Sequence, residues 1–147
     1  MKKTLVTGVL LCFACAAFAQ AKVDAWSMFA KTKFESRYYE NLGEYLFFPL
    51  FTEELKKLEG KEITVQGYYV PFAPEGGDYI VLSKFPMSQC YFCGGGGPES
   101  IVEVYFSDED AKFTQDDLIT IKGKLKLNEK DMEHMPFIVM DGVLVSK

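Results

Sequence analysis

The sequence predicts a mainly β protein, an OB-like five-stranded barrel with short helices and an aromatic-rich N-terminal extension. Apolar and polar residues alternate with a period of two in the chain after Gly60, which is typical of strands with one buried face. Five such strands follow one another, with a short helical piece between the third and the fourth. Glycines inside two strands are typical of the bulges and bends that a small barrel needs. A two-sheet β-sandwich that also includes residues 34–48 is the alternative.

The five strands are expected at 63–70, 79–82, 102–106, 119–127 and 137–145. Pro71 ends the first strand, and a long loop from Lys84 to Ser100 follows the second. Ser107-Asp108-Glu109-Asp110 has the spacing of a capping box for a helical piece that ends near Phe113. The first and fourth strands share a pattern, Ile63-Thr64-Val65-Gln66-Gly67 and Ile119-Thr120-Ile121-Lys122-Gly123.

The chain divides into three parts: a cleaved signal peptide at 1–19, an extension at 20–59 and the barrel at 60–147. In the extension, residues 34–39 read as a strand whose hairpin partner is 45–48. A short helix is expected at 52–58, because Thr52 can cap it, acidic residues occupy its first turn and lysines its last, and Gly60 stops it.

The N-terminus predicts export. Lys2 and Lys3 precede an apolar run, and Ala17-Phe18-Ala19 offers a small-x-small cleavage site before Gln20, so we expect a periplasmic or secreted protein with no integral membrane segment in its mature chain. The chain of 147 residues has 21 acidic and 16 basic side chains, a formal net charge of −5, and the predicted cleavage removes two of the lysines. Such an acidic domain is a poor partner for nucleic acid, because nothing would neutralise the phosphates.

Two cysteines remain after Cys12 and Cys15 leave with the signal peptide. Cys90 and Cys93 form a Cys-x-x-Cys-Gly sequence, in which two thiolates can bind one metal ion if the backbone turns sharply after them. This is half of a tetrahedral zinc site. His134 is the single histidine and lies in the loop after the fourth strand. In an OB barrel the loops after the second and fourth strands open at the same end, so we expect His134 to be the third ligand.

Further ligands and the metal itself stay open. Glu99, Asp131 and Glu133 are candidates for the fourth position, and an open water position is the alternative. Zn²⁺ is the expected ion. Three methionines near these loops, Met87, Met132 and Met135, would favour Cu⁺ instead if their thioethers bound.

Two other functions are compatible with the cysteines. In an oxidising compartment they could form an inert disulfide in a structural or interaction module. A thiol–disulfide oxidoreductase is the less favoured alternative, because four glycines and Pro98 follow and no helix can start there to activate a thiolate. No nucleophile–base pair or carboxylate dyad stands out, so we expect a protein that is not an enzyme.

The loop also carries a resemblance. Residues 85–94, Phe-Pro-Met-Ser-Gln-Cys-Tyr-Phe-Cys-Gly, continue through Gly97-Pro98-Glu99-Ser100 and resemble a family of small exported bacterial proteins of unknown function. The likeness extends to Leu58-Glu59-Gly60-Lys61, Gly67-Tyr68-Tyr69-Val70-Pro71 and Gly123-Lys124-Leu125-Lys126-Leu127. Related families look zinc-associated and are encoded beside ABC-type permeases. The resemblance thus implies a periplasmic metal-handling or accessory role, with an inner-membrane transporter component as a possible partner and Cys90, Cys93 and His134 as matching residues.

Overall fold

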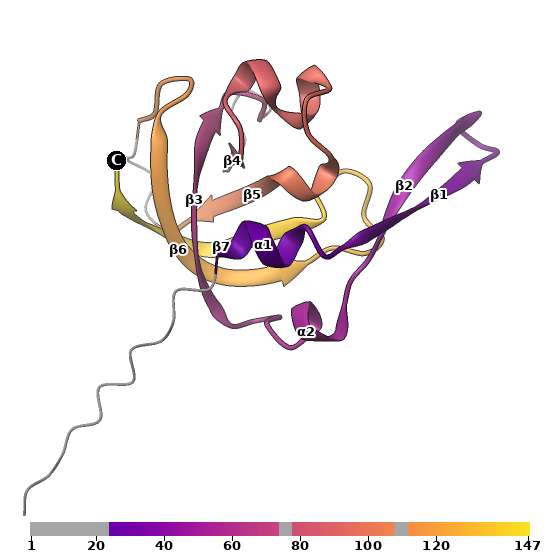
Figure 1. The fold of residues 1–147 in the computed structure, drawn as a ribbon, viewed down its shortest axis with the longest axis horizontal. Helices are drawn as coiled ribbons and strands as arrows, with labels where there is room; N and C mark the ends of the chain where they lie inside the picture. Colours follow the sequence, from indigo (N-terminus) through magenta and orange to yellow (C-terminus); the bar gives the residue numbers. More distant parts are fainter. Residues whose placement is uncertain (1–23, 74–77, 108–111) are drawn as a thin grey trace, which may run out of the picture.

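The structure, a computed structural model, describes residues 24–73, 78–107 and 112–147 (Figure 1). The predicted signal peptide and the capping-box residues Asp108–Asp110 lie outside these ranges. The strands are β1 (Lys33–Tyr39), β2 (Glu44–Leu50), β3 (Glu62–Val70), β4 (Tyr79–Ser83), β5 (Ile101–Phe106), β6 (Leu118–Leu127) and β7 (Phe137–Ser146). The helical segments are α1 (Ala25–Phe29), α2 (Glu53–Lys56) and the 3₁₀ turns η1 (Met87–Gln89), η2 (Tyr91–Cys93) and η3 (Pro98–Ser100).

Five strands close into a barrel in the order β3-β4-β5-β7-β6, with β6 pairing back to β3. Every pair is antiparallel except β5 and β7, which run parallel. The OB-like five-stranded barrel predicted from the alternation is therefore confirmed. The alternative of a two-sheet sandwich is wrong, because residues 34–48 belong to a separate two-stranded sheet instead of covering the barrel strands.

The barrel interior is filled by alternate residues of its strands together with side chains from the N-terminal extension. The buried members are Ala25, Trp26, Phe29, Phe51, Leu55, Val65, Leu82, Val102, Val104, Ile119, Ile121, Leu125, Phe137 and Val139. Asp24 caps α1 by accepting from the Trp26 amide, and the Trp26 indole donates to the Gln66 carbonyl at 2.7 Å. Phe29 stacks on Phe137 with ring centroids 4.1 Å apart. Helix α1 is thus fixed against the barrel (Figure 1), and the extension shares its core.

Helix α2 is shorter than the predicted helix at 52–58. Thr52 is its N-cap, as expected, and its hydroxyl accepts from the Leu55 amide at 3.3 Å. Regular helix ends at Lys56, because Lys57 is the C-cap and the next amides bond three residues back. Leu55 is fully buried in the core, so the single turn of α2 is enough to place this side chain among the core residues.

The glycines inside the strands have two different roles. At Gly123 the register between β6 and β7 shifts, which confirms the expected bulge. At Gly67 the pairing with β6 is continuous, so of the expected bulge or bend no bulge is found there. A Cβ at Gly67 would instead lie 2.8 Å from the Ser83 carbonyl oxygen and 3.1 Å from the Trp26 ring. Gly67 therefore permits the close approach of β4 and α1.

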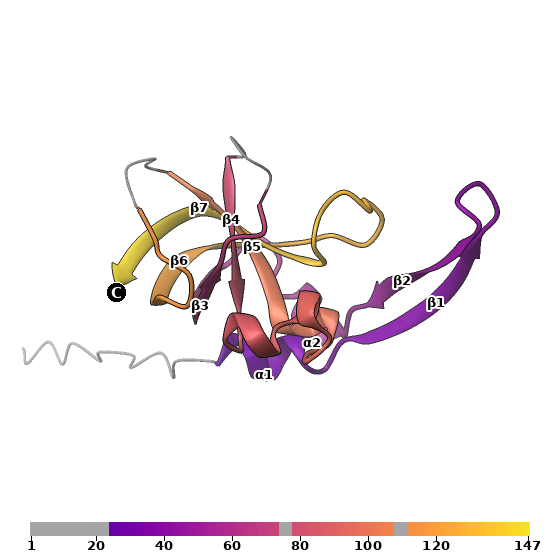
Figure 2. The ribbon, with the colours of Figure 1, turned by 90° about the horizontal axis from the view of Figure 1, so that it is seen from above.

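Strands β1 and β2 form the predicted hairpin, with Tyr38 opposite Tyr45 and Phe34 opposite Pro49. The hairpin extends away from the barrel as a free arm (Figures 1 and 2). Its middle and far end carry exposed aromatic side chains, including Phe47, Tyr38 and Tyr45. Only its base is anchored, where Phe48 is buried.

Candidate functional site

The loop after β4 and the loop after β6 lie over the same outer face of the barrel. Successive residues of a strand point to opposite faces, so Val102 and Val104 of β5 point inward, while Ile101 and Glu103 point outward. On that outer face Ile101 packs with Val70, Val81 and Cys90 in a second buried cluster. Met135, from the β6–β7 loop, packs against this cluster, and its amide donates to Glu103 at 2.7 Å.

The cysteines lie in a tight turn built by the backbone. The Cys93 amide donates to the Cys90 carbonyl at 3.1 Å, and the Gly95 amide reaches the same oxygen at 3.1 Å. Gly94 closes the turn in the left-handed region with φ +79°, the conformation for which glycine was expected after the second cysteine. The local Cys-x-x-Cys-Gly geometry therefore agrees with the sequence analysis.

The two thiols are neighbours with different environments. Cys90 is fully buried in the outer cluster, Cys93 is exposed, and both are free cysteines. Desolvation by the surrounding loop raises the pKa of Cys93, and the hydrogen bond and charge of the adjacent Cys90 raise it further. This is the opposite of the lowered pKa that activates a catalytic thiolate.

His134 is held by a buried carboxylate that the sequence analysis did not identify. Its Nδ1 lies 3.1 Å from Glu103 Oε2 and 3.4 Å from the Tyr105 hydroxyl. Glu103 is fully buried, and burial raises its pKa despite the Met135 amide and the nearby His134. Burial and the Glu103 charge raise the pKa of Tyr105 to about 12. A carboxylate on Nδ1 leaves Nε2 as the free ring nitrogen, an arrangement common to metal-binding histidines.

One signal in the sequence could have indicated Glu103. The residue stands in the middle of the apolar run Ile101-Val102-Glu103-Val104-Tyr105-Phe106, on the side of the strand that alternation assigns to solvent. An acid in so apolar a strand is expected to have a partner, because an unpaired buried charge is costly. Identifying His134 as that partner required the position of a loop 31 residues away.

The structure does not bring all the predicted ligands together. Within residues 24–73, 78–107 and 112–147, no group of three His, Cys, Asp or Glu side chains is arranged to hold a metal ion. Cys90 and Cys93 are together, whereas His134 turns to Glu103. Asp131 accepts from the Glu133 amide inside its own loop, at 3.0 Å. Glu99 lies in η3 against the backbone of Gly97.

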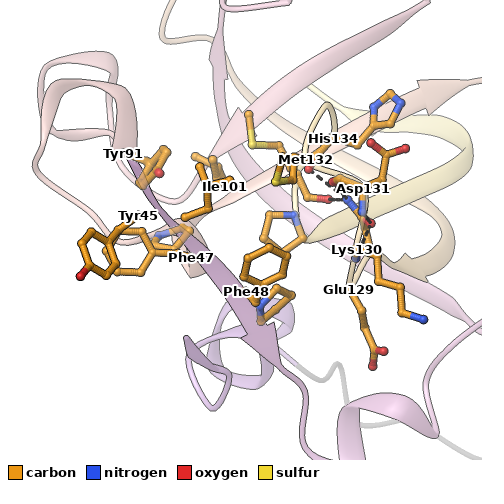
Figure 3. Close-up of a pocket in the computed structure, with 16 residues that line it drawn as sticks. Tyr45, Phe47, Phe48, Tyr91, Ile101, Glu129, Lys130, Asp131, Met132 and His134 are labelled. Carbon is orange, nitrogen blue, oxygen red and sulfur yellow. Dashed lines mark hydrogen bonds between the residues drawn. The ribbon is translucent and has the colours of Figure 1, made fainter. Parts of the chain in front are cut away.

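A cleft of about 430 Å³ separates the hairpin from the β6–β7 loop. In Figure 3 the hairpin and the cysteine loop contribute Tyr45, Phe47, Phe48 and Tyr91 on one side, and Met132 and His134 lie on the other. Pro98 and Ile101 also line it, together with the charged segment 129–131. The cleft thus has apolar walls and a charged rim, and it begins next to the cysteine turn.

Fold and site together define an OB-like barrel that carries a paired-thiol loop on the outer face of β4 and β5. Neither a protein-family profile nor a curated protein matches the sequence. Among solved structures, the chain is similar to a DUF3299 family protein from Pseudomonas aeruginosa PAO1, with a TM-score of 0.46 and 16% sequence identity over 67% of this chain and 68% of that one. No helix in the described part of the chain has the length and apolar character needed to cross a membrane.

Proposed function

We propose that the protein is an exported, non-catalytic accessory protein that binds one metal ion through Cys90 and Cys93. The observation that supports this proposal is the pair of adjacent thiols in a Cys-x-x-Cys-Gly turn closed by Gly94. Deprotonated thiolates are strong ligands for Zn²⁺ and Cu⁺. A bound cation would also offset the raised pKa of Cys93, because it stabilises the thiolate directly.

The metal is Zn²⁺ or Cu⁺, and the two ions make different demands on this site. Zn²⁺ takes four ligands, so two must come from outside the thiol pair: His134 after a movement of its loop, a solvent molecule or a partner protein. Cu⁺ is favoured by soft sulfur ligands. The thioether residues Met87 and Met135 pack against the cluster that contains Cys90. The surroundings of the thiols therefore support Cu⁺ at least as well as Zn²⁺.

Thiol–disulfide exchange is supported less well. In a redox enzyme the attacking cysteine is the accessible one and has a lowered pKa. Here the accessible cysteine is Cys93, and its pKa is raised. Cys93 ends a three-residue 3₁₀ turn and is followed by glycine, so no α-helix dipole stabilises its thiolate.

Transfer of the ion to a membrane transport system fits the exposure of one ligand. Cys93 is accessible while Cys90 is enclosed, so a ligand atom from the partner protein could replace the Cys93 thiolate on the ion first. The adjacent apolar cleft, next to Tyr91, offers a surface for that partner. In OB barrels the second and third strands form the usual binding face, and these strands are β4 and β5 here.

Metal titration of the reduced mature chain under anaerobic conditions tests this function. We expect uptake of one Zn²⁺ or one Cu⁺ per chain, measured by native mass spectrometry and by competition with a chromophoric chelator. Cys93→Ser should abolish stoichiometric binding, whereas Ser88→Ala, an exposed residue of the same loop, is the control that leaves it unchanged. Absence of uptake of either ion would contradict the proposal.

The variant His134→Ala tests whether His134 is a ligand of the bound ion. If Zn²⁺ is bound with His134 as third ligand, this variant should lose at least about tenfold in zinc affinity, since each such ligand contributes well over 1.4 kcal/mol. If Cu⁺ is held by sulfur alone, its affinity should not change.

Titration of free thiols in the protein before it is reduced tests the remaining alternative, an inert Cys90–Cys93 disulfide in an interaction module. A complete absence of reactive thiols, together with an absence of metal uptake, would favour that alternative.

A further inference from the structure

The outer edge of strand β1 has no partner within the described residues. β1 pairs only with β2, and all its residues except Phe34 are exposed. A ribbon of two strands is marginally stable in water, and an open edge presents unpaired amides and carbonyls to other chains. The exposed fractions of Tyr38, Tyr45 and Phe47 are 53%, 67% and 63%, which is a large aromatic surface for an unsupported arm. A further strand paired with this edge would satisfy these backbone groups and cover part of the aromatic surface.

We propose that a second copy of this chain supplies that strand, with the two β1 edges pairing antiparallel about a two-fold axis through Ser36. The two hairpins then form one four-stranded sheet. The order of side chains along β1, Lys33-Phe34-Glu35-Ser36-Arg37-Tyr38-Tyr39, favours a second copy of this chain as the partner.

This order is complementary to itself when it is reversed about Ser36. Glu35 then lies opposite Arg37 of the second copy, and Arg37 lies opposite its Glu35. Opposite residues in an antiparallel pair share a face, so these charges make two cross-strand ion pairs. Arg37 already bonds Glu35 within one chain, at 2.6 Å, and both side chains are about half exposed, so each remains accessible to a second partner.

The remaining positions of the pairing are also compatible. Phe34 lies opposite Tyr38 of the second copy on the face that carries Phe47, which covers part of the exposed aromatic surface. Lys33 lies opposite Tyr39 of the second copy, where an ammonium group can rest on the ring. Every pair within the strand is thus aromatic, oppositely charged, cation–aromatic or small.

The outer edge of β2 is the less suitable edge. Pro49 lies within β2 and has no amide hydrogen to donate to a ladder. Residues 45–49 also border the cleft that faces the β6–β7 loop, where a second hairpin would meet that loop. A closed dimer through β1 leaves this cleft free, so the inference does not depend on the metal-binding proposal.

Charge reversal tests the pairing on the metal-free mature chain, with sedimentation velocity over a concentration series as the measurement. We expect the native chain to show a monomer–dimer equilibrium that weakens with added salt. Glu35→Arg alone places arginine opposite Arg37 in both symmetric contacts, and Arg37→Glu alone places two glutamates opposite each other. Each should raise the dimer dissociation constant about tenfold or more, because like charges directly opposite destabilise a pair.

Two combinations make the test specific to the register. The double variant Glu35→Arg/Arg37→Glu restores opposite charges and should dimerise like the native chain. An equimolar mixture of the two single variants should form a heterodimer, since one chain then offers two arginines and the other two glutamates. Glu44→Arg, the same charge change on β2, is the control and should leave the equilibrium unchanged.

A native chain that stays monomeric into the millimolar range would overturn the inference. So would a dimer that the single reversals do not weaken, or one that the double variant and the mixture fail to restore. Binding of the monomer to lipid vesicles through its aromatic arm, lost in Phe47→Ser, would assign the arm to a membrane surface and would likewise overturn it.

Discussion

At the scale of single residues, Glu103 is the most constrained group of the candidate site. It is fully buried on the outer face of β5 and is satisfied by the Met135 amide and the His134 ring. Burial raises its pKa above the ordinary 4.5, so the folded state binds this proton more tightly than the unfolded chain does. Its contribution to stability is therefore complete at low pH and is lost as the pH rises from about 4.5 through the folded-state pKa.

The variant Glu103→Gln should remove this pH dependence, because glutamine keeps the shape and an oxygen that can accept from the Met135 amide but does not titrate. Urea unfolding between about pH 4 and 8 gives the free energy of unfolding of both proteins. We expect the native protein to lose stability relative to the variant as the pH rises through the window just above 4.5. Parallel profiles for the two proteins would contradict the raised pKa of Glu103.

The two cysteines should respond differently to the same substitution. Cys90→Ser places a hydroxyl in a fully buried apolar cluster and should lower the free energy of unfolding by about 1–3 kcal/mol. Cys93→Ser changes an exposed side chain and should stay within about 0.5 kcal/mol of the native value. Urea unfolding of the reduced proteins measures both. Equal losses would show that Cys90 is not enclosed as described.

The sequence allowed the cysteine turn to be predicted but not the partners of His134. The turn is local: its glycine and its spacing determine the backbone, and Gly94 has the expected positive φ. The placement of His134 depends on how two loops settle on one sheet face. Topology assigned both loops to the same end of the barrel, yet the ring turns to Glu103, a residue that alternation had assigned to solvent.

At the scale of elements, α1 contributes three buried side chains to the barrel core, those of Ala25, Trp26 and Phe29. The helix has five residues, too few to be stable alone, so packing of Trp26 and Phe29 on the barrel must hold it. Phe29→Ala should cost about 3–5 kcal/mol because it leaves a cavity beside Phe137. Ser27→Ala, on the exposed side of the same helix, is the control and should cost far less. The denaturant midpoints of the two variants measure this difference. Equal midpoints would contradict the claim that packing of Phe29 in the core holds α1 on the barrel.

The strands could be predicted because apolar and polar residues alternate along them, as expected for a strand with one buried face. In β6 the buried residues Ile119, Ile121 and Leu125 alternate with Thr120 and with exposed lysines at 122, 124 and 126, which predicts the inward face without any tertiary information. Thr120 departs from the pattern because it is buried as well. The close approach at Gly67 was not predicted, since a glycine needed for a bulge and one needed for a close approach look the same in sequence. Only the position of Trp26 and Ser83 distinguishes them.

At the scale of the whole molecule, the extension and the barrel share one core. Phe29, Phe51 and Leu55 pack among barrel residues, so a chain reduced to residues 60–147 would expose that apolar surface. We expect residues 20–147 to unfold in one cooperative transition and this fragment to lack that transition. Near-ultraviolet circular dichroism and thermal unfolding measure the difference. A fragment with a native-like transition would mean that the extension is a dispensable addition.

The central claim is that Cys90 and Cys93 hold one ion together. X-ray absorption at the metal edge of the loaded, reduced protein counts the sulfur ligands directly. For Zn²⁺ we expect two sulfur scatterers at about 2.3 Å, completed by nitrogen or oxygen, and for Cu⁺ a first shell of sulfur only. A first shell of nitrogen and oxygen without sulfur would contradict the account.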